Sequence, residues 1–148
     1  GQYLGLGDPR RAAQAIRLCW LIGAGIMTAM GVVFIVAPQP LTRLIAPDEP
    51  ALYETAATLL RIAGPVQFFF GSYLVLSHAL RGAGDTRTAM LLTYASTFLL
   101  RLPGAWLMGY VLDLGLTGVW FALAGELVVR GGLFMTRFFH GGWRRIEV

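Results

Sequence analysis

Four long apolar stretches constrain this chain more than any other feature of its sequence. They cover about residues 11–37, 52–80, 87–111 and 117–140. Each is as long as the roughly 20 residues that a helix needs to cross the hydrocarbon core of a bilayer, or longer. Only 14% of the residues are charged and 56% are hydrophobic, which is far from the balance of a soluble domain. We therefore expect an all-α, polytopic helical membrane protein with four transmembrane helices in contact with membrane lipid.

The twelve basic residues are all arginines, and their placement predicts the orientation of the helices. Most of them lie on one side of a four-helix path: Arg10, Arg11, Arg17, Arg81, Arg87, Arg137, Arg144 and Arg145. Positive residues collect on the cytoplasmic side of membrane proteins, so we expect this side and the C-terminus to be cytoplasmic, with the chain in a bacterial inner (plasma) membrane. Because the arginines sit at the ends of apolar stretches, the net charge of +4 does not indicate a nucleic acid partner.

The pattern G-x-G-D-[P/T]-R-x-A occurs twice, as GLGDPRRA at residues 5–12 and within RGAGDTRTA at residues 81–89. Glycine permits a tight turn between antiparallel helices, and Asp8 and Asp85 are expected to cap the helix that follows. No strand precedes either copy and no Gly-Lys-Ser/Thr follows, which argues against a phosphate-binding loop. We expect two cytoplasmic loops that mark repeated hairpin units. Their motif residues are Gly5, Gly7, Asp8, Arg81, Gly82, Gly84 and Asp85.

Four segments carry a resemblance to a known family. GQYLGLGDPRRA, LRGAGDTRTAM, LRLPGAWLMGYVL and GLTGVWFAL are similar to the C-terminal part of multidrug and toxic compound extrusion (MATE) transporters. The resemblance implies that residues 1–148 are a fragment of the C-terminal six-helix bundle, holding the last four of twelve helices. It also implies an antiporter that exports cationic or amphipathic drugs and toxins in exchange for H⁺ or Na⁺. The missing N-terminal part of the transporter would be its partner.

The choice between H⁺ and Na⁺ stays open at this stage. Many Na⁺-coupled members of the family place an acidic residue in the tenth helix, whereas the matching stretch here, residues 52–80, has only Glu54 at its outer mouth. Coupling could use an acid in the N-terminal bundle or Glu126 in the last stretch. No further cofactor is expected.

Ionisable residues inside the apolar stretches are candidates for a substrate or ion pathway, because a charge at membrane depth is costly and usually faces protein or water. Arg61, Arg101 and Glu126 fall at comparable depth in alternating helices, which predicts an Arg–Glu–Arg cluster across three helices. Arg130 follows Glu126 by four residues, a favourable order for a local pair. Two interpretations remain, a cation or proton relay and a structural ion pair that locks the last three helices.

Two prolines inside the stretches are candidate hinges. Pro65 and Pro103 lack an N–H group, so both helices should kink or loosen there. Near Pro65 lies a patch that could hold an aromatic cation, made of Gln67, Phe68, Phe69, Phe70 and Tyr73. Small residues spaced four apart predict close helix packing at three pairs: Gly25 with Ala29, Ala105 with Gly109, and Gly118 with Ala122.

Other classes of protein fit less well. Cys19 is the single cysteine, and neither a nucleophile–base pair nor a metal-ligand grouping is visible, so we expect no enzyme and no metal site. The chain opens on Gly1 with no short apolar segment and cleavage site, so no signal peptide is expected. Two alternatives remain: a lipid-linked oligosaccharide flippase of the same superfamily, and a non-transporting four-helix membrane scaffold. The arginines inside the stretches favour the former over the latter, since a scaffold needs no buried charge.

Overall fold

The computed structural model describes residues 2–145, of which the side chains of residues 144 and 145 are not described. The described residues form helices and connecting turns, with no strand among them. The all-α prediction is therefore confirmed. In chain order the elements are α1 (Gln2–Gly5), α2 (Pro9–Val36), α3 (Pro38–Ile45), η1 (Pro50–Leu52), α4 (Tyr53–Gly82), α5 (Thr86–Ser96), η2 (Thr97–Arg101), α6 (Leu102–Trp106), η3 (Leu107–Val111), α7 (Gly115–His140) and η4 (Gly142–Arg145).

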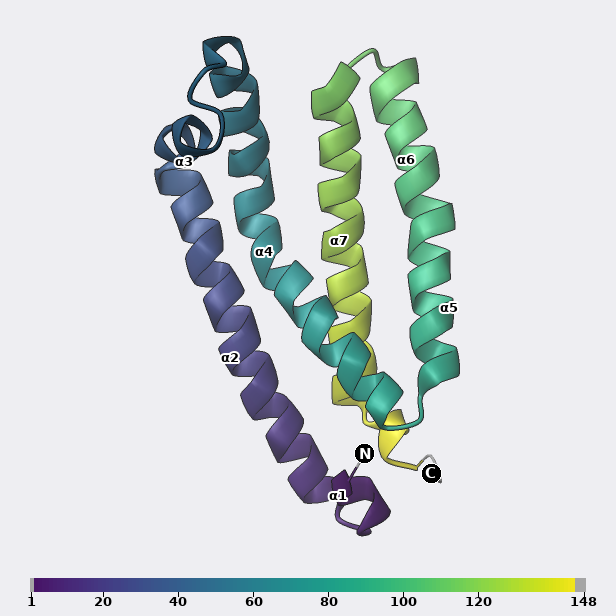
Figure 1. Ribbon diagram of the computed structural model, residues 1–148. Coiled ribbons are helices and arrows are strands. Elements are labelled where there is room, and N and C mark those ends of the chain that lie inside the picture. The colour runs from purple at the N-terminus through teal and green to yellow at the C-terminus, as the bar shows by residue number, and fades with distance from the viewer. Residues whose placement is uncertain (1, 146–148) are drawn as a thin grey trace.

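Three of the four predicted spans are continuous helices. Among the described residues, α2, the run Pro50–Gly82 that contains α4, and α7 are each long and apolar enough to cross a membrane. The third predicted span differs, because α5 and α6 alternate with the π-helical segments η2 and η3. Every residue from 86 to 111 is nevertheless helical, and Figure 1 shows α5 and α6 as one rod beside α7.

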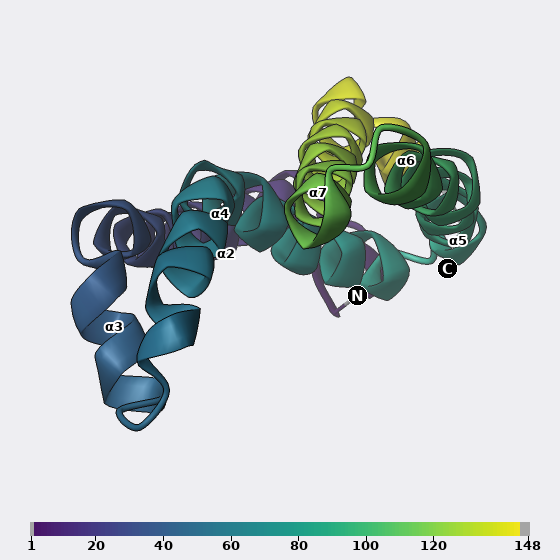
Figure 2. The ribbon, with the colours of Figure 1, turned by 90° about the horizontal axis from the view of Figure 1, so that it is seen from above.

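Helix α4 is the centre of the arrangement. It packs against α2 and against α7, while the α5–α6 rod packs against α7. Figure 2 shows the same order from above, with α3 extending to one side of the helices. Buried apolar residues from α2, α4, the α4–α5 loop, α5, α7 and η4 meet at one end of the molecule: Ala12, Ala13, Leu76, Leu80, Ala83, Ala89, Phe134, Phe138 and Trp143. The helices converge on this core and spread apart toward the other end (Figure 1).

Both prolines loosen their helices, as predicted. Pro65 lies inside α4, whose two halves run in different directions (Figure 1). Near Pro103 the chain widens into a π-turn, in which the Leu102 N–H donates to the Thr97 carbonyl oxygen five residues earlier. Proline cannot donate to the carbonyl four residues before it, and a π-turn is one way to accommodate that loss.

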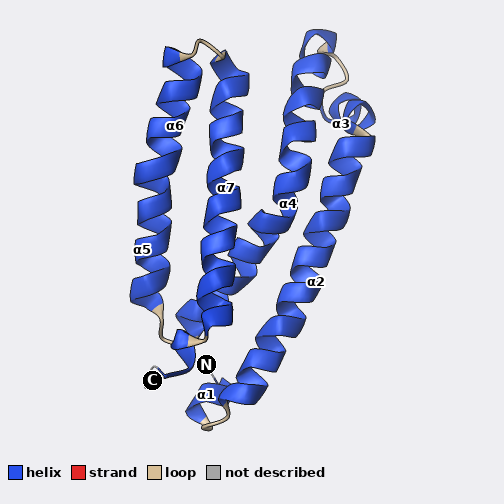
Figure 3. Cartoon of the chain, turned by 180° about the vertical axis from the view of Figure 1, so that it is seen from behind, coloured by secondary structure: helices blue, strands red, loops and turns tan. Residues whose placement is uncertain are grey.

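The two G-x-G-D loops lie at the same end of the molecule as the last turn of α7 (Figure 3). Gly7 and Gly84 have φ angles of +72° and +85°, in the left-handed region that glycine enters without strain. Gly5 and Gly82 end the helices before the turns. The turn chemistry predicted for the second glycine of each motif is therefore confirmed.

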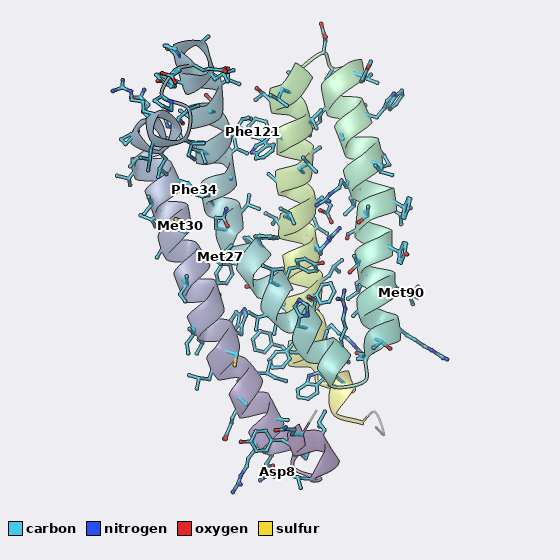
Figure 4. All side chains as sticks on the ribbon, in the orientation of Figure 1. Asp8, Met27, Met30, Phe34, Met90 and Phe121 are labelled. Carbon is cyan, nitrogen blue, oxygen red and sulfur yellow. The ribbon has the colours of Figure 1, made fainter. Side chains whose placement is uncertain are left out.

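The two aspartates of the loops differ. Asp8 accepts a hydrogen bond from the Arg11 N–H at 3.0 Å and caps α2 as predicted, at the lower end of that helix (Figure 4). The same role was wrong for Asp85, whose side chain makes no capping hydrogen bond. Asp85 is buried and instead accepts a hydrogen bond from Arg137 Nε of α7 at 2.8 Å. The difference arises because the end of α7 packs over the second loop and supplies a charged partner there.

Candidate functional site

The candidate site lies where η2 faces the middle of α7. The π-turn of η2 ends at Arg101 and is followed by Pro103 in α6. Because a π-turn holds one more residue than an α-turn, it changes the direction in which the side chains around it point. Figure 4 shows side chains that project from α7 and from the α5–α6 rod into the space between them.

Glu126 is the centre of a buried charge cluster. Its side chain is fully buried, and both carboxylate oxygens face guanidinium groups. Arg101 Nη2 donates to Oε2 at 3.0 Å, and Arg130 Nη2 lies 2.6 Å from Oε1. The contact to Oε1 lacks hydrogen-bond geometry, so its attraction is chiefly that of opposite charges at short range. Glu126 thus bridges two arginines.

The predicted cluster was wrong in one member. Arg61 of α4 is exposed and takes part in none of the ion pairs among the described side chains. The ion pairs of Glu126 therefore join α7 to η2, and Arg61 lies outside the site. Its depth along the helix matched that of Glu126, but its side chain points elsewhere.

Arg130 is held by three groups that sequence reasoning did not bring together. Its Nε donates to Ser96 Oγ at 2.8 Å, and its Nη2 donates to Thr97 Oγ1 at 2.6 Å. The guanidinium carbon also lies 5.0 Å from the centre of the Tyr73 ring, within the range of a cation–π interaction. Arg130 therefore links α7 to α5, η2 and α4. Ser96 and Thr97 carried no recognisable signal, since single hydroxyl residues are common in membrane helices.

A cavity of about 250 Å³ lies beside the cluster, between α4 and α7. Its walls are mostly apolar, and two polar side chains, Gln67 and Arg101, also line it. The lining residues are Ala63, Val66, Gln67, Phe70, Arg101, Trp120, Leu123, Ala124 and Leu127. The Trp120 ring is oriented by a hydrogen bond from its Nε1 to the Leu59 carbonyl oxygen at 3.0 Å.

The aromatic patch predicted from the sequence is divided by the fold. Gln67 and Phe70 line the cavity, whereas Phe68 packs edge-to-face with Trp20 and Phe69. Tyr73 lies under Arg130. The patch is therefore not one surface for an aromatic cation. Among the described residues no three His, Cys, Asp or Glu side chains are grouped closely enough to hold a metal ion.

Membrane-length helices with ionisable side chains buried between them define a polytopic integral membrane protein. The sequence model of the MatE family matches residues 1–107, so the chain belongs to that family. The match confirms the family resemblance; it covers the first two of the four sequence segments and part of the third, and it ends before the fourth.

Several curated relatives support the assignment. The chain is 30% identical over 148 residues to the probable multidrug resistance protein NorM of Thermotoga maritima, covering 100% of this chain and 32% of the relative. It is 38% identical over 128 residues to the NorM of Pseudomonas syringae pv. tomato, covering 84% and 28%. With the multidrug resistance protein NorM of Burkholderia vietnamiensis it shares 34% over 142 residues, covering 93% and 31%. The chain thus spans about a third of the length of these relatives. No solved structure matches it significantly.

Proposed function

We propose that the chain forms the last four helices of a MATE antiporter, within its C-terminal bundle, and helps to export amphipathic or cationic compounds in exchange for H⁺ or Na⁺. The observation that carries the proposal is the cavity between α4 and α7, with apolar and aromatic walls and two polar side chains. Ligand pockets commonly have this character. The named relatives are multidrug resistance proteins, which favours a transporter over an enzyme.

The cluster around Glu126 acts in this proposal as a structural lock. A proton or cation relay needs a carboxylate that can exchange its partner, whereas both oxygens of Glu126 already face an arginine. The coupling acid is then elsewhere in the transporter, in a part that packs against these helices.

A flippase for lipid-linked oligosaccharides is supported less well. A flippase of this kind is expected to have several arginines in its cavity. Of Arg61, Arg101 and Arg130, only Arg101 lines the cavity. One positive group beside apolar walls suits a small amphipathic compound better than a long anionic headgroup.

Export can be tested with the complete gene product in liposomes. We expect ethidium to move against its gradient when a pH or Na⁺ gradient is imposed, and to stop when that gradient is collapsed. The ion whose gradient is required identifies the coupling ion. The 148 residues alone should transport nothing, because a substrate cavity between bundles needs the partner bundle. Gradient-dependent efflux by the 148-residue chain, or none by the complete gene product, contradicts the proposal.

We also propose that the two G-x-G-D loops face the cytoplasm. Both loops lie at one end of the molecule together with the last turn of α7 (Figure 1), and most of the arginines belong to these segments of the sequence, as expected of a cytoplasmic side. In a Cys19→Ser background, Thr86→Cys should be protected from an impermeant thiol reagent added outside intact cells. Glu49→Cys, an equally exposed position at the opposite end, should react. Permeabilised cells are the control, in which both cysteines react; the reverse labelling pattern in intact cells contradicts the orientation.

A further inference from the structure

A groove lies where the end of α4 meets the start of α5. Its volume is about 310 Å³, and the residues that line it are Arg81, Thr86, Met90, Thr93 and Tyr94. Arg81 is in the last turn of α4, and the other four belong to α5. Figure 4 places Met90 on the lower part of α5, toward the α4–α5 loop. The groove thus has one arginine at its loop end and continues along the α5–α6 rod.

The positive charge of Arg81 is not neutralised by a neighbouring acid. Arg81 is exposed and takes part in none of the ion pairs among the described side chains. The first G-x-G-D loop differs, because Arg11, which lines a groove beside it, pairs there with Asp8 at 3.2 Å. In the second loop the aspartate, Asp85, is held by Arg137 at 2.7 Å. The groove at Arg81 therefore keeps a free positive charge.

The rest of the groove suits a hydrocarbon chain. Met90 and Tyr94 are exposed, and the Tyr94 ring stacks on the Phe98 ring with 5.9 Å between their centres. Phe98 is also exposed and lies one turn further from the loop, so the apolar surface continues along the rod. At the other end Thr86 is exposed, and its hydroxyl can donate a hydrogen bond to an oxygen of a ligand.

An anionic phospholipid matches both parts of this groove. Arginine forms charge-assisted and often bidentate hydrogen bonds with phosphate, and an arginine at the end of a membrane helix reaches the level of the headgroups. A free phosphate would satisfy the arginine alone and would leave the apolar walls uncovered. A zwitterionic lipid has no net charge, so it gains less than an anionic lipid from a free arginine.

We propose that this groove binds an anionic phospholipid, with the phosphate at Arg81 and Thr86 and an acyl chain along Met90, Tyr94 and Phe98. The proposal goes beyond export, because the lipid site lies outside the cavity between α4 and α7. In the orientation proposed above, the phosphate lies in the cytoplasmic leaflet, whose anionic lipids attract arginines near the surface. The bound lipid then ties the α4–α5 loop to the membrane surface.

The test compares two phospholipids with identical acyl chains on the purified, delipidated complete gene product. Phosphatidylglycerol is anionic and phosphatidylcholine is zwitterionic, and each is radiolabelled and measured by its retention on the immobilised protein in detergent. We expect phosphatidylglycerol to bind about fivefold more tightly, the scale of one arginine near a membrane surface. Inorganic phosphate at the same concentration should not displace it. Equal binding of the two lipids, or displacement by inorganic phosphate, overturns the proposal.

Variants locate the site. Arg81→Gln should weaken phosphatidylglycerol binding about fivefold and leave phosphatidylcholine binding unchanged. Met90→Glu keeps Arg81 but adds a negative charge to the groove, so it should also weaken phosphatidylglycerol binding. Both positions are exposed, so both variants are expected to fold. Arg10→Gln, at an exposed arginine of α2 that does not line the groove, is the matched control and should bind as the parent does.

The lipid preference must depend on Arg81 in particular. A preference for phosphatidylglycerol that survives Arg81→Gln overturns the assignment, and this is the result expected if another part of the transporter covers the groove. An equal loss in Arg10→Gln overturns it as well, because the preference then reflects surface charge in general. Since the measurement uses no ion gradient, its failure leaves the efflux result intact, and failure of efflux leaves the lipid result intact.

Discussion

Glu126→Gln is expected to lower the thermal stability of the complete gene product in detergent, while transport per folded molecule stays close to that of the parent. The change removes the one negative charge between Arg101 and Arg130. Removing one partner of a buried ion pair typically costs about 3–5 kcal/mol, because the remaining charge is left buried without compensation. Efflux should therefore fall only as the amount of folded protein falls.

Two further variants sharpen this test. Glu54→Gln, at an exposed acid at the start of α4, is the matched control and should leave the melting temperature unchanged. The exchange of Glu126→Arg with Arg101→Glu restores a carboxylate between η2 and α7 and should recover part of the lost stability. If Glu126→Gln keeps the parent's melting temperature yet stops export, the residue is a relay and the structural lock is wrong.

Gly31→Ala is expected to destabilise the packing of α2 on α4. A Cβ atom at Gly31 would meet the carbonyl oxygen of Gly64, and one at Gly64 would lie 2.8 Å from the carbonyl oxygen of Gly31. Backbone atoms cannot rotate away as a side chain can, so the two helices must separate. Overpacking of this kind typically costs about 1–3 kcal/mol. The measurement is thermal unfolding of the complete gene product in detergent.

Gly25→Ala is the matched control on the same helix. No atom lies within 4 Å of a Cβ placed there, so the change should be neutral or should stabilise α2 by up to about 1 kcal/mol through helix propensity. Equal melting temperatures for the two variants would show that α2 and α4 do not approach each other at Gly31. Gly25 and Ala29 are exposed, so no other described helix packs closely on that predicted pair. Gly118 and Ala122, by contrast, are buried as predicted.

Much of the fold followed from local patterns. The lengths of the apolar stretches predicted α2, α4 and α7, because membrane crossing depends on length and hydropathy alone. Gly7 and Gly84 predicted their turns, because backbone freedom is a property of the residue itself. Pro103 predicted a loosened helix, although the sequence did not show that the result would be a π-turn. Of the three arginines expected to meet Glu126, Arg101 and Arg130 do.

Only the tertiary structure decided which side chains face one another. Sequence position sets the depth of a residue along a helix, and on that basis Arg61 and Arg101 were equal partners for Glu126. The direction of a side chain around the helix changes by about 100° per residue, and the kink in α4 and the π-turn in η2 both alter it. Arg101 therefore reaches Glu126 whereas Arg61 remains exposed. Likewise, the sequence pattern predicted that Asp85 would cap the helix directly after it. In the structure its partner is Arg137, which lies 52 residues later in the chain. The sequence by itself determined the membrane-spanning segments and their turns. The charge cluster and the cavity depended on how those segments are rotated and packed, because ion pairs require atomic contact between segments distant in the chain.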